Sequence, residues 1–183
     1  MEVERAVRLA RGGDRKSLSD LCEYFHPQLY RFFLRLTASP ADADDLAQGT
    51  LLKMMERLES FHFLPGRRFE GWLFRIAYNL FIDGKRRDRF LPLDDEFPIP
   101  DPSPGAEERL ILAESAQAVR RAVLTLDAEL QALISMRYET EMSYRDIAQA
   151  MNISVTRVKW RLHEALGKLR TILEEKEKGG VRP

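Results

Sequence analysis

Apolar residues recur at intervals of three and four along most of the chain, which is the period of an amphipathic helix. No segment shows the strict apolar-polar alternation of a β-strand, and no internal repeat is apparent. The pattern therefore predicts an all-α protein. The expected helices cover residues 2–11, 17–37, 40–60, 68–88, 106–124, 127–138, 143–151 and 154–176.

Residues 90–105, FLPLDDEFPIPDPSPG, interrupt the helical pattern. They hold five prolines and four acidic residues in sixteen positions, with no basic residue. Proline is excluded from helix interiors because it lacks the N–H group and clashes with the preceding turn. The segment is therefore expected to be a flexible acidic linker. It divides the chain into helical domains at 1–89 and 106–176, and a tail follows at 177–183.

The helix expected in RFEGWLFRIAYNLFIDGKRR, residues 68–87, is apolar on two sides. An ordinary surface helix has one apolar stripe and a polar back. Either this helix is sandwiched in a core, or it meets a partner with π-faces and phosphates. One face carries Phe69, Trp72, Leu73, Ile76 and Leu80, and the opposite face carries Phe74, Tyr78 and Phe81.

The same part of the chain is rich in aromatic and basic residues. Seven of the seventeen aromatics lie between positions 61 and 81, and seven Lys or Arg residues lie between 67 and 89. Aromatics interleaved with basic residues suit the binding of unpaired nucleic-acid strands. A base flipped out of a duplex needs a stacking wall and a polar group, for which the loop SFHFLPGRR and Asn79 are candidates. The alternatives are that the aromatics form core and that Asn79 is simply exposed.

Residues 142–170, MSYRDIAQAMNISVTRVKWRLHEALGKLR, predict a helix-turn-helix. Ser143 and Asp146 form a capping-box pattern for the first helix. Asn152 fits a left-handed turn position, and Ser154 caps the second helix. The expected core stripe of the second helix is Val155, Val158, Leu162, Leu166 and Leu169.

The other side of that second helix is basic, with five basic residues and one acid between 153 and 170. We expect Arg157, Trp160 and Glu164 to point away from the core, with Lys159 and His163 on the flank. Such side chains can contact phosphates and base edges in the major groove. The alternative is an ordinary solvated amphipathic helix.

The segment DADDLAQGTLLKMMERL, residues 42–58, has a different character. Its acids would be repelled by DNA, so the predicted face suits docking on a partner protein. The alternative is an acidic first turn that complements the helix dipole. The residues expected to share this docking face are Asp44, Asp45, Gln48, Leu51 and Met55.

Bulk composition narrows the function classes. With 29 basic and 29 acidic residues, the chain of 183 residues has no global attraction to nucleic acid, so any contact depends on local patches. The one cysteine, Cys22, excludes an internal disulfide and a cysteine-based metal site and favours a buried structural thiol. His26, His62 and His163 lack metal-ligand spacing, and DGKRR lacks the spacing of a phosphate loop. We therefore expect no catalytic residue, metal, cofactor or small-molecule substrate.

The N-terminus has no secretory apolar segment, and no apolar run approaches the length that spans a bilayer. A soluble, cytoplasmic protein is expected.

Three blocks together resemble the extracytoplasmic-function (ECF) sigma factors, the small two-domain branch of the bacterial sigma-70-type family. They are DADDLAQGTLLKMMERLESF, RFEGWLFRIAYNLFIDGKRR and the helix-turn-helix at 142–170, in the order that the family has them. The resemblance covers roughly residues 5–172. It implies a sigma region two-like bundle and a region four-like helix-turn-helix domain, with no enzymatic activity.

The resemblance also implies partners and roles. The helix with Asp44, Asp45, Gln48, Leu51 and Met55 would dock on the β′ clamp coiled coil of core RNA polymerase, and region four would contact the β flap. An anti-sigma factor is the expected regulatory partner. The minus-ten element of promoter DNA would meet Asn79, Phe61, Phe63, Arg67, Arg68, Arg86 and Arg87, and the minus-thirty-five element would meet Arg157, Lys159, Trp160, His163 and Glu164.

Departures from the family pattern concern affinity and sequence preference. Gly49 stands where the family usually has Glu, while Trp160 and Glu164 stand where small and basic residues are common. Asn152 replaces a common Gly in the turn. Two alternatives stay open from the sequence: a stand-alone helix-turn-helix regulator, and a degenerate relative that binds core polymerase without initiating transcription.

Overall fold

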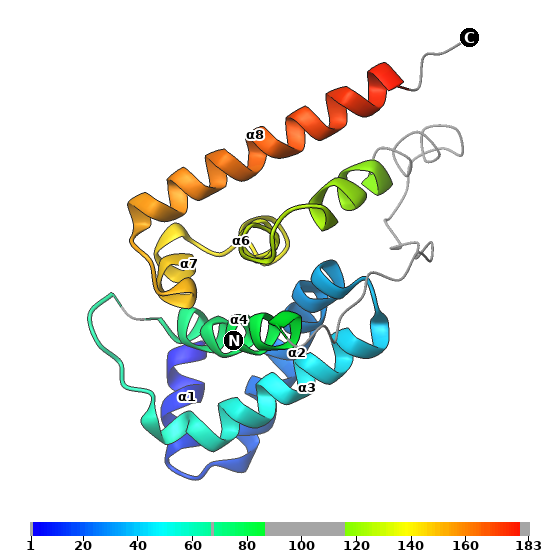
Figure 1. Cartoon of the computed structure of the whole chain (residues 1–183). Helices are drawn as coiled ribbons and strands as arrows, with labels where there is room; N and C mark the ends of the chain where they lie inside the picture. The colour runs from blue at the N-terminus through cyan, green and yellow to red at the C-terminus, as the bar shows by residue number, and fades with distance from the viewer. Residues whose placement is uncertain (1, 67, 87–115, 180–183) are drawn as a thin grey trace, which may run out of the picture.

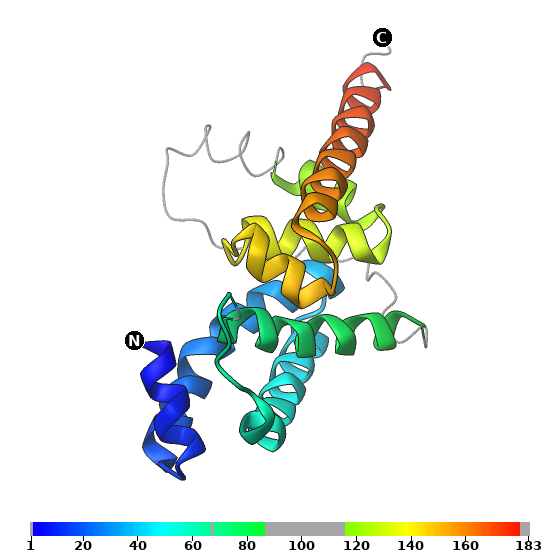
Figure 2. The ribbon, with the colours of Figure 1, turned by 90° about the vertical axis from the view of Figure 1, so that its left-hand side faces the viewer.

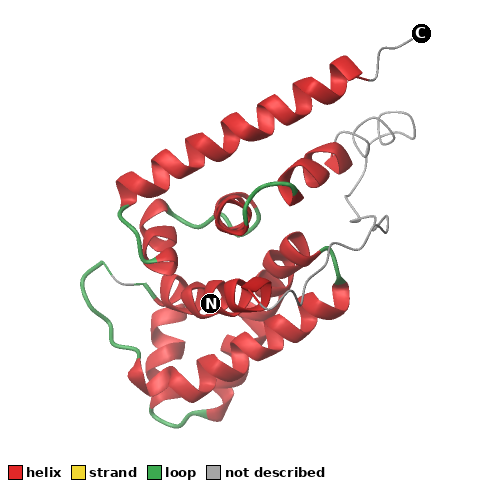
Figure 3. Ribbon diagram, in the orientation of Figure 1, coloured by secondary structure: helices red, strands yellow, loops and turns green. Residues whose placement is uncertain are grey.

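The computed structural model describes residues 2–66, 68–86 and 116–179. Every regular element in these residues is a helix, as Figure 3 shows, which confirms the all-α prediction. The linker predicted at 90–105, the start of the helix predicted at 106–124, and residues 180–183 of the tail lie outside the described residues.

Four helices form the N-terminal bundle. Asp14 and Ser39 cap the second and third of them, accepting hydrogen bonds from the backbone N–H of Ser17 at 3.0 Å and of Asp42 at 3.3 Å. Such caps satisfy N–H groups that have no partner inside the helix. The elements are α1 (Val3–Arg11), α2 (Arg15–Thr37), α3 (Pro40–Arg57) with a 3-10 turn η1 (Leu58–Ser60), and α4 (Phe69–Arg86).

The C-terminal bundle contains the predicted helix-turn-helix. Ser143 caps its first helix by accepting from the N–H of Asp146 at 3.2 Å. Asn152 ends that helix in the left-handed region with φ 57°, and Ser154 then accepts from the N–H of Arg157 at 3.1 Å. The bundle consists of a helical segment at 116–124, α6 (Ala128–Tyr138), α7 (Tyr144–Met151) and α8 (Val155–Gly179).

Phenylalanine rings from α2 and α4 form the centre of the N-terminal bundle. The Phe25 and Phe69 ring centroids lie 5.6 Å apart, and those of Phe32 and Phe74 lie 5.4 Å apart. All four side chains are at most 1% exposed. Burial of a ring of this size contributes about 1.5–3 kcal/mol, so these aromatics fix α4 on α2.

The two bundles pack against each other, which differs from the expectation of separate domains on a tether. Helix α7 lies on α4 and α6 contacts α2 (Figures 1 and 2). At the second contact, the Ser135 hydroxyl donates to the Phe32 carbonyl at 3.4 Å, and Arg35 forms an ion pair of 2.5 Å with Glu139. We call this arrangement the closed conformation.

Helix α4 is buried on both of its predicted apolar faces. Its predicted first face is buried at Phe69, Trp72, Leu73 and Ile76, and its opposite face is buried at Phe74 and Phe81, all at most 8% exposed. Of the two hypotheses for this helix, the sandwich is confirmed in the closed conformation, since α4 contacts α2 and α3 as well as α6 and α7. Leu80 and Tyr78 are half-buried.

Candidate nucleic-acid interface

Helix α8 presents the predicted basic face to solvent. Arg157, Lys159 and His163 are exposed, and Trp160 is the most exposed large apolar side chain in the described residues at 62%. The helix is held by a core stripe of Val158, Leu162, Ala165 and Leu169, which are at most 9% exposed. This face can meet a major groove without rearrangement inside the bundle.

The predicted core stripe of α8 was wrong at two positions. Val155 and Leu166 are 36% and 42% exposed, while Ala165 is fully buried. A buried stripe follows the spacing i, i+4, i+7, i+11, which selects Val158 and the small Ala165. Leu166 was predicted as the buried residue because it is larger and more hydrophobic than Ala165, but Leu166 lies one position beyond the buried stripe.

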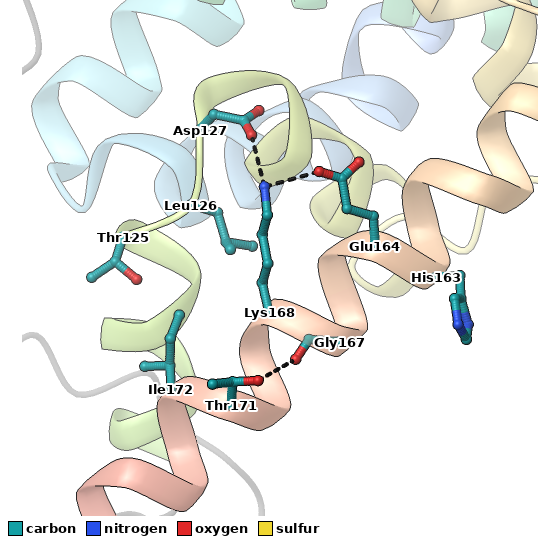
Figure 4. A pocket seen from close by; sticks show the side chains of 9 residues that line it. All are labelled: Thr125, Leu126, Asp127, His163, Glu164, Gly167, Lys168, Thr171 and Ile172. Atoms are coloured by element: carbon teal, nitrogen blue, oxygen red, sulfur yellow. Dashed lines mark hydrogen bonds and ion pairs between the residues drawn. The ribbon is translucent and has the colours of Figure 1, made fainter.

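The prediction that Glu164 points away from the core was also wrong. Its carboxylate accepts from the Lys168 ammonium at 2.9 Å and lies 3.8 Å from Arg161. Figure 4 shows the Lys168 side chain between Glu164 and Asp127, with the Asp127 carboxylate 3.8 Å from the Lys168 ammonium. His163 projects from another side of the helix. Lys168 thus links Glu164 on α8 with Asp127 at the start of α6.

Asn79 lies on the exposed side of α4. Three other residues of this helix are exposed along the same stripe as Asn79. Arg75 lies four residues before Asn79, Asp83 four residues after it and Arg86 seven residues after it. The sequence predicted Asn79 and Arg86 as DNA-contacting residues, but Arg75 was not predicted. The spacing of four residues from Asn79 was the signal that pointed to it.

The loop before α4 is anchored by an aromatic cluster. The Phe61 ring lies 4.9 Å from that of Phe63, 5.3 Å from Phe69 and 5.2 Å from Trp72. Phe61 is fully buried, so the prediction that it forms an accessible stacking wall was wrong: it holds the base of the loop in the core.

The tip of the loop is accessible. Phe63 is half-buried, Leu64 is 56% exposed, and Gly66 has a φ of 77° that permits the turn there. The aromatic cluster meets the first turn of α4, whereas Asn79 lies about 15 Å further along the axis at 1.5 Å per residue. The aromatic cluster at the loop base and Asn79 thus lie at different positions along α4. Arg67 and Arg87 lie outside the described residues.

Arg68 is bound by the C-terminal bundle. Its guanidinium donates to the Asp146 carboxylate at 3.3 Å, and a second guanidinium nitrogen lies 3.3 Å from Glu70. Its backbone N–H donates to the Gln149 side-chain carbonyl at 3.2 Å, and the Gln149 amide donates back to the Arg68 carbonyl at 3.1 Å. Asp146 is 3% exposed, so the pair sits at the edge of the bundle interface.

Between α4 and α8 lies a cavity of about 270 Å³. Tyr78 faces it, and burial, together with the charge of Glu129, raises the pKa of this phenol. Glu129 pairs with Arg161. The cavity is lined by Tyr78, Glu129, Met151, Ile153, Arg157 and Arg161.

Helix α3 presents most of the predicted docking face. Asp45, Gln48 and Met55 are exposed, and Asp44 accepts from the Gln48 amide at 2.7 Å. Leu51 is 7% exposed and belongs to the bundle core, so its placement on this face was wrong.

Two further observations refine the α3 face. Leu52 is 56% exposed and was missed, although it lies four residues from Gln48 and three from Met55. A Cβ added at Gly49 would meet nothing within 4 Å, so the departure from the family's Glu at this position is not imposed by packing.

Other candidate chemistry can be placed as well. Within residues 2–66, 68–86 and 116–179, no group of three His, Cys, Asp or Glu side chains is arranged to hold a metal ion. Burial raises the pKa of the half-buried Cys22 thiol, which favours its unreactive protonated form. None of the helices in the described part of the chain is both long and apolar enough to cross a membrane.

Comparisons with known proteins cover both bundles. Residues 21–90 match the model of sigma-70 region 2, and residues 122–171 match that of sigma-70 region 4. The ECF RNA polymerase sigma factor SigL of Mycobacterium tuberculosis is 34% identical over 155 residues, which cover 80% of this chain and 83% of SigL. The chain belongs to the ECF sigma factors.

Two further relatives span nearly the whole chain. The ECF sigma factor SigW of Bacillus subtilis is 25% identical over 96% of this chain and 98% of its own. The structure of CnrH in complex with the cytosolic domain of CnrY is similar with a TM-score of 0.66 and 26% identity, covering 93% of this chain and 96% of CnrH.

Membership of this family settles the function class. The protein is a sigma factor of RNA polymerase that initiates transcription, a non-enzymatic and DNA-binding role that is carried out in the cytoplasm. A stand-alone helix-turn-helix regulator would leave the match of residues 21–90 without explanation.

Proposed function

We propose that this sigma factor recognises the two promoter elements with two separate surfaces. The exposed face of α8, with Arg157, Lys159, Trp160 and His163, binds the minus-thirty-five element. Asn79, Arg68 and the loop at 61–66 capture the minus-ten element. The observation that carries the proposal is the exposed basic face of α8, in which Trp160 is 62% exposed on a helix-turn-helix with both helices capped.

Core polymerase engages other surfaces. The exposed side of α3, with Asp45, Gln48, Leu52 and Met55, docks on the β′ clamp coiled coil, and the C-terminal bundle contacts the β flap. Acidic and amide groups beside exposed apolar side chains support a protein partner at α3, since phosphates would be repelled there. The neutral total charge supports weak DNA binding by the free protein, because phosphate contacts dominate that affinity.

The same proposal assigns residues 1–89 to region two, 90–105 to the acidic linker and 106–176 to region four. The promoter elements are separated by roughly 25 base pairs, or about 85 Å at 3.4 Å per base pair. Helix α7 contacts α4 in the closed conformation, so both elements cannot be bound until the bundles separate. Promoter recognition therefore requires opening of the interface.

A protein partner is part of the proposal. CnrH, which is similar over most of its length, was solved in complex with the cytosolic domain of CnrY. We infer that an anti-sigma factor binds this chain as well and keeps it from core polymerase.

The test is run-off transcription from a library of genomic fragments, with core polymerase alone and with core plus this protein. Discrete start sites that require the protein are expected, and their alignment gives both promoter elements. Binding to duplex DNA without polymerase, combined with the absence of new transcripts, would contradict the proposal.

A further inference from the structure

Helix α1 contacts the segment that leads into the loop at 61–66. The region 2 model matches residues 21–90, so α1 lies outside the matched residues while its contact partners Glu59 and Phe63 lie inside them. The Arg8 guanidinium lies over the Phe63 ring, 4.8 Å from its centroid. Arg11, one turn further on, donates to the Glu59 carbonyl at 3.2 Å.

These contacts fix one side of the loop base while the core fixes the other. Phe63 lies between the Arg8 guanidinium and the buried Phe61 ring, 4.9 Å away. The tip beyond Phe63 is exposed, with Leu64 at 56%. A loop that is already ordered loses less conformational entropy when it captures a ligand.

We propose that α1 is a brace for the minus-ten loop and that Arg8 is a positioning residue for base capture. Arg8 touches no base itself. It holds the Phe63 ring, and through it the path of the chain into Leu64 and Arg68. This inference rests on the assignment of the loop to the minus-ten element.

The geometry of Arg8 supports a role beyond general attraction to DNA. Its side chain is 65% exposed and within 3.8 Å of the Glu4 carboxylate, so part of its charge is offset on α1 itself. The planar guanidinium covers the face of Phe63, which is the arrangement that stabilises a cation on an aromatic ring. A lysine at this position would keep the cation but lose the planar stacking.

The experiment compares holoenzymes that carry Arg8→Ala, Arg8→Lys or Arg5→Ala at a promoter identified by the run-off library. Arg5 is exposed on the same helix and controls for the loss of one positive charge. The readout is the ratio of initiation rates between the native minus-ten sequence and single-base variants. A cation–π contact at an exposed site corresponds to about a two- to fivefold change, so Arg8→Ala is expected to lower the ratio by that factor. Arg8→Lys restores part of it, and Arg5→Ala leaves it unchanged.

Core binding and the thermal unfolding midpoint of each variant are measured in parallel; core binding is expected to match the wild-type protein, and the midpoint of Arg8→Ala is expected to fall by no more than about 2–4 °C. The loop itself is tested with Leu64→Ala. If Leu64→Ala alters minus-ten discrimination and Arg8→Ala does not, the brace is wrong and the loop assignment stands. If neither variant alters it, the loop assignment fails and the brace fails with it. Equal losses in Arg8→Ala and Arg5→Ala would also overturn the brace.

Discussion

The two candidate DNA-binding surfaces differ in what already occupies them. On α8, Arg157 and Lys159 are exposed and Trp160 faces solvent. In front of α4, the Arg68 guanidinium is paired with Asp146, and the Arg68 backbone exchanges two hydrogen bonds with Gln149. Closure therefore occupies part of the proposed minus-ten surface and leaves the proposed minus-thirty-five surface accessible.

This difference arises because the two helices of the helix-turn-helix face different surroundings: α7 packs on α4, and α8 faces solvent. Helix α7 supplies Asp146 and Gln149, which cover Arg68, while α8 displays the basic face a few residues later. Moving α7 off α4 frees Arg68 and at the same time allows α8 to reach DNA far from α4. We expect opening to control minus-ten recognition more strongly than minus-thirty-five recognition.

The largest expected effect comes from the accessible surface. The double variant Arg157→Ala/Lys159→Ala removes two side chains that can contact base edges, each worth about 1–3 kcal/mol when the contact is bidentate. Transcription that depends on the minus-thirty-five element should fall accordingly, while preference at the minus-ten element stays unchanged. Footprinting of the holoenzyme on both elements measures this.

Arg170→Ala is the control for this variant, because Arg170 lies on the same helix with a side chain that is 81% exposed. Unaltered protection of the upstream element in the double variant would show that α8 is not the recognition helix.

The second prediction concerns the surface around Arg68, and the variant is designed to force the two bundles apart. A Cβ at Gly71 would lie 2.9 Å from the Gln149 Cδ atom and 3.1 Å from its Cβ atom. Gly71→Ala therefore crowds the interface of α4 and α7, at a cost of about 1–3 kcal/mol for overpacking. The closed population should fall, and the radius of gyration should rise above the value of about 16 Å expected for a compact chain of this length.

Small-angle X-ray scattering of the free protein measures this change. Gly167→Ala is the matched control, because a Cβ there meets nothing within 4 Å. Adding Gln149→Ala to Gly71→Ala removes the contact with the Gln149 Cδ atom but leaves the one with its Cβ atom, and it also removes the bonds to Arg68, so closure should return only in part. Identical scattering from Gly71→Ala and the wild-type protein would mean that α7 does not hold α4 in solution.

A smaller effect is expected at Asn79, which closure leaves exposed. Asn79→Ala should reduce discrimination at one minus-ten base by roughly two- to tenfold, the range for a lost hydrogen bond of about 0.5–1.5 kcal/mol. Binding to core polymerase should be unaffected, since the proposed docking face lies on α3 and Asn79 is on α4. Initiation rates on promoters with single-base changes provide the measurement, and an unchanged base preference would show that Asn79 does not read a minus-ten base.

The sequence predicted local structure well because its signals are local. The caps at Ser143 and Ser154 and the left-handed Asn152 were all found in the structure. Each depends on the chemistry of neighbouring backbone groups, which periodicity and residue type describe directly.

What the sequence could not predict depends on contacts between distant segments. The pairing of Arg68 with Asp146 joins residues 78 positions apart, and no local pattern marks it. Leu51 and Glu164 were placed on exposed faces because their spacing allowed it, yet Leu51 is buried in the bundle core and Glu164 is half-buried and paired with Arg161 and Lys168 of its own helix. The two apolar faces of α4 suggested a sandwich, but the sequence did not show which helices cover them: α2, α3, α6 and α7 all contact α4.

The smallest effect concerns Tyr78, which lines the cavity between the bundles and reports closure directly. Burial and Glu129 raise the pKa of its phenol above the ordinary 10.0. The closed state therefore binds the phenol proton more tightly than an open state does. Ionisation of Tyr78 does not change the stability of the closed state below pH about 10. Above that pH the stability of the closed state falls as the pH rises through the raised pKa of Tyr78.

Titration of phenolate absorbance, with the Tyr78→Phe variant subtracted, isolates this group among the five tyrosines. In the Gly71→Ala background, the pKa of Tyr78 should move down toward its ordinary value, because separation of the bundles returns the phenol to water and removes Glu129 from its surroundings. A pKa that stays equally raised in both backgrounds would mean that α4 and α2 alone bury Tyr78. The contrast between an occupied and an accessible surface would then no longer follow from the packing of α7 on α4.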